Sequence, residues 1–444
     1  MKILVIFLFS LFLKADVINN SNLDVLYALD IEDSFILNKD LQEVYKDYSS
    51  KKKRYFIEVL EDGYNILPII RNAINKAKIP KELISVAMAE SFLTLNAKSS
   101  KMAKGLWQFM PETAKRFNLK IDKYVDERLD PNKSTEAAIN YLKFLHNFFG
   151  KWYLAILAYN AGEARVVEAV VRAKVDKLCK SLKNQCKKNP SIKEYRKIIK
   201  NYQLHKKNSY IKLYKLYQLL ESIPLKLEDL LVFQKGLDRQ YLPKETRNYI
   251  IKILAMSFLF NNDDFIEYSN SYILNSGITS QYKKVNVPPG TSLYYIAKLL
   301  KMNYQTLKEH NLHLKYSFTP PYKYYIYIPY EKVGFFKKNF KGTKKFFYVY
   351  KVKKGDNIFK IAKTFGINTK IIKDYNKLGK YLKIGQKILI PMKSRIIKYK
   401  VKNGDTLYAL SKKFGVSYKK IIKINNLKNH YIRVGQILKI PQRL

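Results

Sequence analysis

The residues best suited to do chemistry lie between positions 90 and 111 and begin with a single glutamate. Glu90 ends the segment KIPKELISVAMAE, in which apolar residues recur at helical spacing, among them Leu83 and Ala87. Since Glu90 follows both at helical intervals, it lies on the apolar side of the predicted helix. Burial there would keep the carboxyl group protonated near neutral pH, as a general acid requires. The alternative role is a structural cap or ion pair.

Three further motifs carry side chains that could surround a sugar. The sequence GLWQFMP at residues 105–111 combines a glycine turn, a large aromatic ring and the amide of Gln108. Its glycine would let the backbone approach a ligand closely, and its proline suits the first turn of a following helix. The sequence AYNAG follows at residues 158–162, and LPKETRNY at residues 242–249. Each motif is weak alone, but together with Glu90 they are specific.

In this order the motifs resemble those of the lytic transglycosylases of bacterial cell-wall turnover, in particular the membrane-bound type D branch. The resemblance implies a mostly α-helical, lysozyme-like domain, expected at residues 64–260, with a groove for a glycan strand. Glu90 matches the family's single catalytic acid and base, and Tyr249 matches a tyrosine near that acid. The residues implied to line the groove and position the N-acetylmuramyl unit are Ser99, Gln108, Tyr159 and Asn160.

A single carboxyl group determines the expected reaction. Ordinary glycosidases use two carboxylates, whereas residues 90–111 contain only Glu90. One carboxyl suffices if it first protonates the glycosidic oxygen and then takes the proton of the muramyl C6 hydroxyl, which attacks C1 and closes a 1,6-anhydro ring. Further along, Asp122, Asp126 and Asp130 lie in a charged connector and are expected to be caps and members of surface ion pairs.

The composition excludes a disordered chain and argues against a nucleic-acid partner. The 444 residues are 47% hydrophobic and 14% aromatic, enough for two to four domains with hydrophobic cores. The formal charge of +47 comes from basic residues spread over every segment, so no single tail or helix face is marked as a nucleic-acid site. A basic surface would attract the free carboxylates of peptidoglycan stems; a genome-wide compositional bias explains the charge equally well.

The first fifteen residues have the pattern of a targeting segment. Lys2 gives a positive start, residues 3–13 are apolar, and Ala15 is a small residue at a candidate cleavage site. The apolar run is short for a membrane span, and a retained signal anchor is the alternative to cleavage. No cysteine follows the run to carry a lipid. We expect a periplasmic or cell-envelope protein bound peripherally to the wall, with the outer membrane as a further candidate surface.

The two cysteines and five histidines predict a disulfide and no metal site. Cys179 and Cys186 could close a small loop in an exported chain. The histidines do not cluster with Cys, Asp or Glu at ligand spacing, and His310 and His313 are expected at the surface. We therefore expect neither a metal nor another cofactor.

A repeat occupies the C-terminal part of the chain. The sequence of residues 352–391 recurs at residues 401–441. Each copy has the pattern strand, helix, helix, strand, and resembles the LysM modules that bind N-acetylglucosamine chains. We expect these modules at residues 346–392 and 396–442. A degenerate copy is expected at residues 281–330, where the pattern indicates the fold rather than sugar binding.

In the two regular modules the sugar would lie between the loop after the first strand and the loop before the last strand. The residues expected at these loops are Gly355, Asp356, Asn357, Asn376, Gly404, Asp405, Thr406 and Asn425. The two aspartates are expected to act mainly as helix N-caps. Two or three weak sites on one chain would gain affinity through effective concentration.

The chain is therefore predicted to be a multidomain α+β protein, with a mostly helical lysozyme-like domain followed by small βααβ modules. A helical lead-in at residues 16–63 should pack on the catalytic domain, and a basic insertion at residues 166–235 has no assigned role. The expected function is that of an exported peptidoglycan lytic transglycosylase held on the wall by its LysM modules. The alternatives are a muramidase- or chitinase-type hydrolase on the same fold and a catalytically silent wall-binding scaffold. Peptidoglycan glycan strands are the expected partner.

Overall fold

The computed structural model describes residues 19–262, 265, 281–342, 347–376, 378, 382–391, 394–414, 416–427 and 429–443. The described residues form two compact units, one within residues 19–119 and 131–265 and the other within residues 120–130 and 281–443. The expected targeting segment, residues 1–15, lies outside the described residues. Within these described ranges, no helix is both long and apolar enough to span a bilayer.

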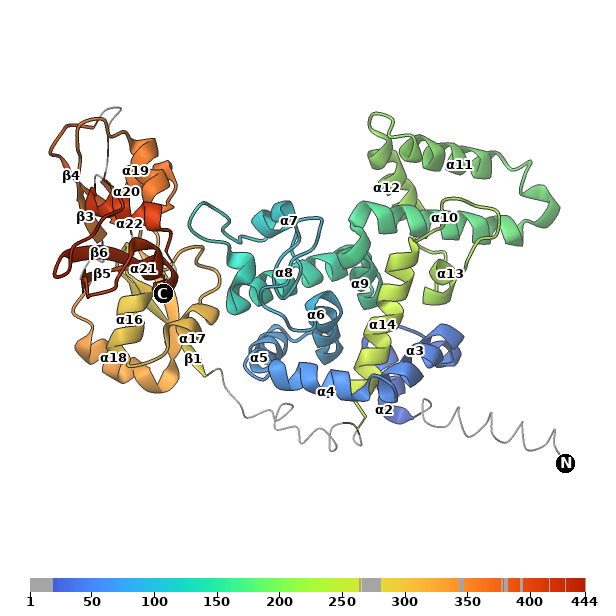
Figure 1. The fold of residues 1–444 in the computed structure, drawn as a ribbon. Coiled ribbons are helices and arrows are strands. Elements are labelled where there is room, and N and C mark those ends of the chain that lie inside the picture. The colour runs from blue at the N-terminus through green and yellow to red at the C-terminus, as the bar shows by residue number, and fades with distance from the viewer. Residues whose placement is uncertain are drawn as a thin grey trace. The chain divides into compact units, whose positions relative to one another are not determined.

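The first unit is built from helices, labelled in chain order in Figure 1. They are α2 (Asn20–Ala28), α3 (Lys39–Ser49), α4 (Lys53–Asp62), α5 (Leu67–Ala77), α6 (Ile84–Ser91), α7 (Pro111–Arg116), α8 (Pro131–Phe149), α9 (Trp152–Ala161), α10 (Glu163–Ser181), α11 (Pro190–Gln203), α12 (Ser209–Leu219), α13 (Leu227–Leu231) and α14 (Lys244–Phe260). The last helix, α14, contacts α2, α3, α6 and α9 and is buried over most of its length. Its side chains are therefore held in fixed positions.

Local sequence explains where two helices beside the GLWQFMP motif begin and end. Pro111 stands in the first turn of α7, where its missing backbone N–H leaves no bond unmade. The helix α6 ends at Ser91, because Phe92 and Leu93 adopt left-handed backbone with φ of 48° and 59°. This ending leaves Glu90 in the last turn of α6.

The N-terminal helices α2 and α3 pack on the central helix α14. Leu26, Phe35 and Leu41 are fully buried among them. Asn38 caps α3, since its side-chain oxygen accepts a hydrogen bond from the backbone N–H of Leu41 at 3.1 Å. The described part of the expected lead-in is thus a helical layer on the first unit.

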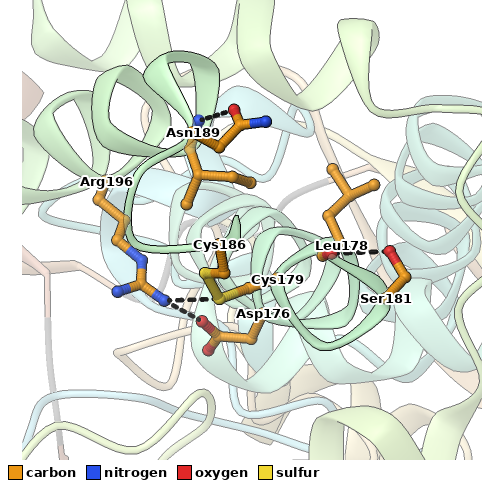
Figure 2. Close-up of a disulfide and its surroundings, with 8 residues drawn as sticks. Asp176, Leu178, Cys179, Ser181, Cys186, Asn189 and Arg196 are labelled. Atoms are coloured by element: carbon orange, nitrogen blue, oxygen red, sulfur yellow. Dashed lines mark hydrogen bonds and ion pairs between the residues drawn. A yellow bond between two sulfur atoms is a disulfide. The ribbon is translucent and has the colours of Figure 1, made fainter. Parts of the chain in front are cut away.

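The expected insertion contains most of α10, all of α11 to α13, and a disulfide that joins the last turn of α10 to the segment after it. Cys179 is bonded to Cys186, with 4.9 Å between their Cα atoms. Figure 2 shows the bond beside Arg196 of α11, whose guanidinium lies 3.4 Å from Cys179 Sγ and 3.6 Å from Asp176. The disulfide closes the turn between α10 and α11.

A buried carboxylate, Glu168, joins α10 to α11 and to the segment before α14. It accepts hydrogen bonds from Gln203 at 2.7 Å, from both sides of the Arg239 guanidinium, and from Arg165. Arg172 lies 3.7 Å away. Burial alone would raise the pKa of Glu168, but the hydrogen bonds from Arg239 and Gln203 and the nearby positive charges outweigh it and lower that pKa.

The second unit repeats the order strand, helix, helix, strand three times, with each pair of strands antiparallel. The first repeat contains β1 (Tyr282–Val287), α16 (Leu293–Leu299), α17 (Tyr304–Glu309) and β2 (Tyr324–Pro329), followed by α18 (Val333–Asn339). The second contains β3 (Phe347–Lys351), α19 (Ile358–Phe365), α20 (Thr369–Asn376) and β4 (Lys387–Pro391). The third contains β5 (Ser394–Lys400), α21 (Leu407–Lys413), α22 (Tyr418–Asn425) and β6 (Ile437–Arg443). The βααβ pattern expected from the sequence is confirmed.

An asparagine at or just after the end of the second helix has the same role in all three repeats. Asn311 donates to the carbonyl of Tyr327 at 2.9 Å and accepts from the backbone N–H of the same residue at 2.8 Å. Asn376 forms this pair with β4, and Asn425 with β6. These side chains fasten the second helix of each repeat to its last strand.

The connector at residues 120–130 is folded into the second unit, and its residues 124–128 and 130 are buried. Asp126 is 1% exposed and forms two 2.9 Å hydrogen bonds with Arg128, which is also buried. Asp130 and His313 are both 0% exposed. The expectation of surface ion pairs is therefore wrong for these two aspartates, and the expectation of a surface position is wrong for His313, because the first repeat covers them.

Candidate active site

Glu90, at the end of α6, is hydrogen-bonded to the central helix α14. Tyr249 Oη donates to Glu90 Oε1 at 2.6 Å. Tyr249 is buried within α14, whereas Glu90 retains partial exposure to solvent. The two residues are 159 positions apart, so the packing of α6 on α14 brings them together.

The surroundings of Glu90 raise its pKa from 4.5 to about 7. Burial is the main cause, since it penalises the charged form. The hydrogen bond from Tyr249 opposes the shift, and the negative charge of Glu245 adds to it. Glu245 stands four residues before Tyr249 and so lies on the same side of α14. A carboxyl group with this pKa can both give and take a proton near neutral pH.

The end of α6 is bonded to the turn formed by residues 105–111. Ser91 Oγ donates to the carbonyl of Leu106 at 2.7 Å. Next in the turn, Trp107 is fully buried, and its Nε1 donates to Thr135 Oγ1 of α8 at 3.0 Å. Bonds to both α6 and α8 therefore fix the turn beside the glutamate.

The polar residues of this turn are largely occupied by local hydrogen bonds. Gln108 has left-handed backbone with φ of 44°, and its Nε2 donates to the carbonyl of Gly105 at 2.8 Å. Gly105 itself has φ of 84°, which favours glycine. Ser99 lies exposed in the preceding loop, where its Oγ accepts from the backbone N–H of Ala103 at 3.0 Å.

The AYNAG motif links the turn to α14. Tyr159 Oη donates to the carbonyl of Trp107 at 2.8 Å, and its ring centroid lies 5.2 Å from that of Tyr141. Burial and the nearby charge of Glu90 raise the pKa of Tyr159 well above its ordinary value, so the phenol stays protonated. Asn160 Oδ1 accepts from Thr246 Oγ1 at 2.7 Å.

The structure thus places two predicted residues, Tyr159 and Tyr249, at the Glu90 carboxyl: Tyr249 by direct contact and Tyr159 within range of its charge. Sequence reasoning missed Glu245 and Thr246, which act on Glu90 and Asn160. Their signal was present in ETRNY, since Glu245 and Tyr249 are four residues apart and face one way if the segment is helical.

In the two regular repeats, Asp356 and Asp405 fasten the loop after the first strand. Each accepts from a tyrosine hydroxyl of that strand, at 2.6 and 2.9 Å, and from the backbone N–H three residues earlier. The helix N-caps are instead Asn357 and Thr406, whose side chains accept from the first turn. The expectation that the aspartates are N-caps is therefore wrong by one position.

The other residues expected to bind sugar also have structural roles. Gly355 and Gly404 both have φ of 82°, a conformation that favours glycine. The side chains of Asn376 and Asn425 are bonded to the last strand of their repeats. Any glycan contact in these loops would therefore depend heavily on backbone groups.

The described histidines and acids form no metal centre. In the described part of the chain, no group of three or more His, Cys, Asp or Glu side chains is placed to hold a metal ion. His310 is stacked on Tyr282, with 3.5 Å between ring centroids, and is only partly exposed.

Known families match both units. The transglycosylase SLT domain matches residues 68–178, and the LysM domain matches residues 350–391 and 399–441. The family described as lytic transglycosylase MltD, LysM-like domain, matches residues 281–344. Glu90, GLWQFMP and AYNAG therefore lie within the SLT match, whereas LPKETRNY lies beyond it. The degenerate first repeat falls within the LysM-like family.

Individual relatives share parts of this arrangement. Membrane-bound lytic murein transglycosylase D of Escherichia coli (strain K12) is 25% identical over 360 residues, which cover 77% of this chain and 66% of that protein. A putative tributyltin chloride resistance protein of Alteromonas sp. (strain M-1) is 42% identical over 102 residues, 23% of this chain and 49% of that protein.

Among solved structures, the spore cortex-lytic enzyme SleL of Bacillus megaterium QM B1551 is 38% identical over 22% of this chain and 23% of its own, with a TM-score of 0.13 that supports no conclusion about the fold. The sequence matches carry the assignment. The chain contains a transglycosylase SLT domain, a LysM-like domain of the MltD type and two LysM domains, and spans 66% of the length of the Escherichia coli relative.

Proposed function

We propose that the chain is an exported peptidoglycan lytic transglycosylase that cleaves the β-1,4 bond between N-acetylmuramic acid and N-acetylglucosamine. The observation that carries the proposal is the Glu90 carboxyl within an SLT domain, hydrogen-bonded to Tyr249 at 2.6 Å and with its pKa raised to about 7. The catalytic domain would span residues 64–260. The product would be a 1,6-anhydromuropeptide.

Glu90 would act twice in one turnover. The protonated carboxyl donates its proton to the glycosidic oxygen as the bond from that oxygen to the muramyl C1 breaks. The carboxylate then takes the proton of the C6 hydroxyl while the C6 oxygen bonds to C1. One bond to C1 breaks, another forms, and Glu90 regains its proton without consuming water. Burial favours the protonated form before the first step, and Tyr249 would stabilise the carboxylate between the steps.

The exposure and hydrogen bonds of the other predicted groove residues indicate how each would contribute to sugar binding. Ser99 is exposed and Gln108 partly exposed, so both are placed to meet a sugar directly. Tyr159 and Asn160 are held by Trp107 and Thr246, so they would shape the groove beside Glu90.

The two LysM domains, with expected limits of 346–392 and 396–442, would hold the enzyme on the wall. Their loops at Gly355 and Gly404 carry the left-handed backbone on which the sugar site would be built. Two weak sites on one chain raise the effective concentration of enzyme at an insoluble substrate. The targeting segment at residues 1–15 would deliver the chain to the periplasm, where the wall and the outer membrane are accessible.

A hydrolase is the second candidate because a second carboxylate acts on the same site. The charge of Glu245 reaches Glu90 and raises its pKa. In a hydrolase, such a residue would activate water, and the product would carry a reducing end. The third candidate, a silent scaffold, would release nothing.

Digestion of purified sacculi by the full-length protein distinguishes these three functions. We expect muropeptides lighter by one water than reducing-end products, measured by mass spectrometry, and almost none from Glu90→Gln. Reducing ends would favour the hydrolase, and wild-type protein that releases nothing would favour the scaffold. If Glu90→Gln retained full activity, the assignment of Glu90 would be wrong whatever the products.

A further inference from the structure

The first repeat holds the connector that leads into α8, and the path continues to the candidate active site. We propose that this LysM-like domain serves as a clamp for Glu90 catalysis, with Tyr325 and Tyr327 as positioning residues that fix Asp130. The inference rests on the proposed function, and it assigns the first repeat an intramolecular partner, residues 120–130, in place of a glycan.

The connector is bound to the first repeat along its length. Val125 pairs with Leu314 in an antiparallel β-bridge, and the backbone N–H of Lys315 donates to the carbonyl of Tyr124 at 2.8 Å. The rings of Tyr124 and Tyr316 are in edge contact, with 6.3 Å between centroids. Backbone and ring contacts thus attach the connector to the segment between α17 and β2.

Tyrosine hydroxyls of β2 carry most of the side-chain contact. Tyr324 Oη donates to Glu127 Oε1 at 2.8 Å. Tyr325 and Tyr327 both donate to Asp130, at 2.5 and 3.0 Å. All five side chains are at most 8% exposed, so each hydroxyl bonds a buried carboxylate whose loss of a donor would be costly.

The two regular repeats lack this surface. The asparagine bonds to the last strand align the three repeats, so Tyr325 and Tyr327 have equivalents in β4 and β6. The equivalents are Lys387, Leu389, Ile437 and Lys439. None of these four is a tyrosine and none is buried, whereas Tyr325 and Tyr327 are 6% and 5% exposed. The outward face of the first sheet is thus specialised for the connector.

Covalent and hydrogen bonds lead from Asp130 as far as Tyr159, beside the candidate active site. Asp130 directly precedes Pro131, the first residue of α8. One turn into α8, Thr135 accepts the indole hydrogen bond of Trp107, and the carbonyl of Trp107 accepts from Tyr159. Tyr159 lies within range of the charge of Glu90. The peptide bond from Asp130 to Pro131 therefore joins the residue held by Tyr325 and Tyr327 to the helix that supports the GLWQFMP turn.

A buried histidine of the first repeat lies beside Asp130 in the same contact surface. His313 lies in the same cluster, with Nδ1 4.0 Å from Asp130 Oδ2 and its ring stacked on Tyr325 at 5.2 Å. Neither ring nitrogen has a hydrogen-bond partner at normal distance. Burial lowers the pKa of His313 to about 4, so the ring is neutral and adds no charge to the cluster at neutral pH.

The test compares Tyr325→Phe/Tyr327→Phe with Tyr399→Phe in the full-length protein. Tyr399 also donates to a carboxylate, Asp405, but in the last LysM domain, so it is a matched control. On soluble glycan strands the double variant should lower kcat between about tenfold and a hundredfold with KM nearly unchanged, because small misplacements of catalytic groups cost this much. Its co-sedimentation with sacculi should stay at the wild-type level. Tyr399→Phe should leave kcat on these soluble strands unchanged.

The fluorescence of Trp107 provides a second measurement, since the sequence contains one other tryptophan, Trp152. In a Trp152→Phe background, the double variant should shift the Trp107 emission, whereas Tyr399→Phe should not.

Two results would contradict the clamp. One is a folded double variant with unchanged kcat and unchanged emission. The other is loss of sacculus binding by the double variant, which would make the first repeat a glycan site. If the double variant does not fold, Tyr327→Phe alone gives the same comparison. An inactive wild type would refute the proposed function, while the emission would still test the clamp.

Discussion

Two buried glutamates of the first unit have opposite pKa shifts. Glu90 and Glu168 both lie on helices and both accept hydrogen bonds from other segments. The pKa of Glu90 is raised to about 7, mainly by burial, with one neutral hydroxyl as donor and Glu245 as a like charge nearby. The pKa of Glu168 is lowered, because donors from Arg239, Gln203 and Arg165 outweigh its burial.

The comparison shows that burial alone does not make a carboxyl group an acid catalyst. Glu168 is the more completely enclosed, at 0% exposure, yet its partners fix it as an anion that joins helices. Within the described part of the chain, Glu90 has no cationic hydrogen-bond partner, and it keeps partial access to solvent. The charge of the partners decides which glutamate can change its protonation state near neutral pH.

Exchanging each glutamate for glutamine should separate chemistry from stability. For Glu90→Gln we expect kcat on glycan strands to fall by about two to four orders of magnitude, since the proton donor is lost. The melting temperature near pH 8 should not fall, because ionising a buried carboxyl with a raised pKa costs the folded state free energy. Enzyme assays and thermal melts measure both effects. A large loss of stability in Glu90→Gln would mean that Glu90, like Glu168, has a structural role.

Glu168→Gln should destabilise the fold while leaving the chemistry intact. We expect a loss of about 3–5 kcal/mol, because one charge of a buried cluster is removed and its arginines remain. Because the pKa of Glu168 is lowered in the folded state, this residue stabilises the fold at pH values above 4.5, the ordinary pKa of a glutamate. This stabilisation disappears as the pH falls through the folded-state pKa. Denaturant melts at pH 7 and in acid check the sign. Lost kcat in the folded variant would contradict a structural role.

Tyr249→Phe should test whether the hydroxyl of Tyr249 lowers the pKa of Glu90. Removing the hydroxyl removes the contact that lowers the pKa of Glu90, so this pKa should rise above about 7. The high-pH limb of kcat/KM, where the acid loses its proton, should then move to higher pH. We expect kcat to fall about tenfold, the cost of one hydrogen bond to a charged group. A pH profile measures both, and an unmoved limb would mean that another group controls it.

Glu245→Gln should give the smallest effect and the opposite sign. Its negative charge raises the pKa of Glu90, so the substitution should move the same limb to lower pH. The shift should be less than about one unit, because Glu245 is exposed and solvent screens it. A large loss of kcat would instead assign Glu245 the water-activating role of the hydrolase. Raising the salt concentration should reduce the difference between the wild type and Glu245→Gln in the pH of this limb.

Local patterns in the sequence predicted the helices, the βααβ repeats and the apolar side of Glu90 because these depend on residue spacing over a few turns. The connector at residues 120–130 was misjudged for a physical reason. Asp126 and Asp130 look like surface residues in a charged segment, and only a strand nearly 200 positions away supplies the hydroxyls that bury Asp130. His313 was misplaced for the same reason.

The amino-acid sequence by itself determined which group could act as the acid, since Glu90 follows apolar residues at helical spacing and stands before GLWQFMP. Only the tertiary structure decided its environment. The hydroxyl of Tyr249 and the charge of Glu245 reach Glu90 from a helix more than 150 positions away, and it is these long-range contacts, together with burial, that set a proton affinity. Spacing along a chain encodes a helix face, whereas a pKa depends on everything that the folded chain places around the group.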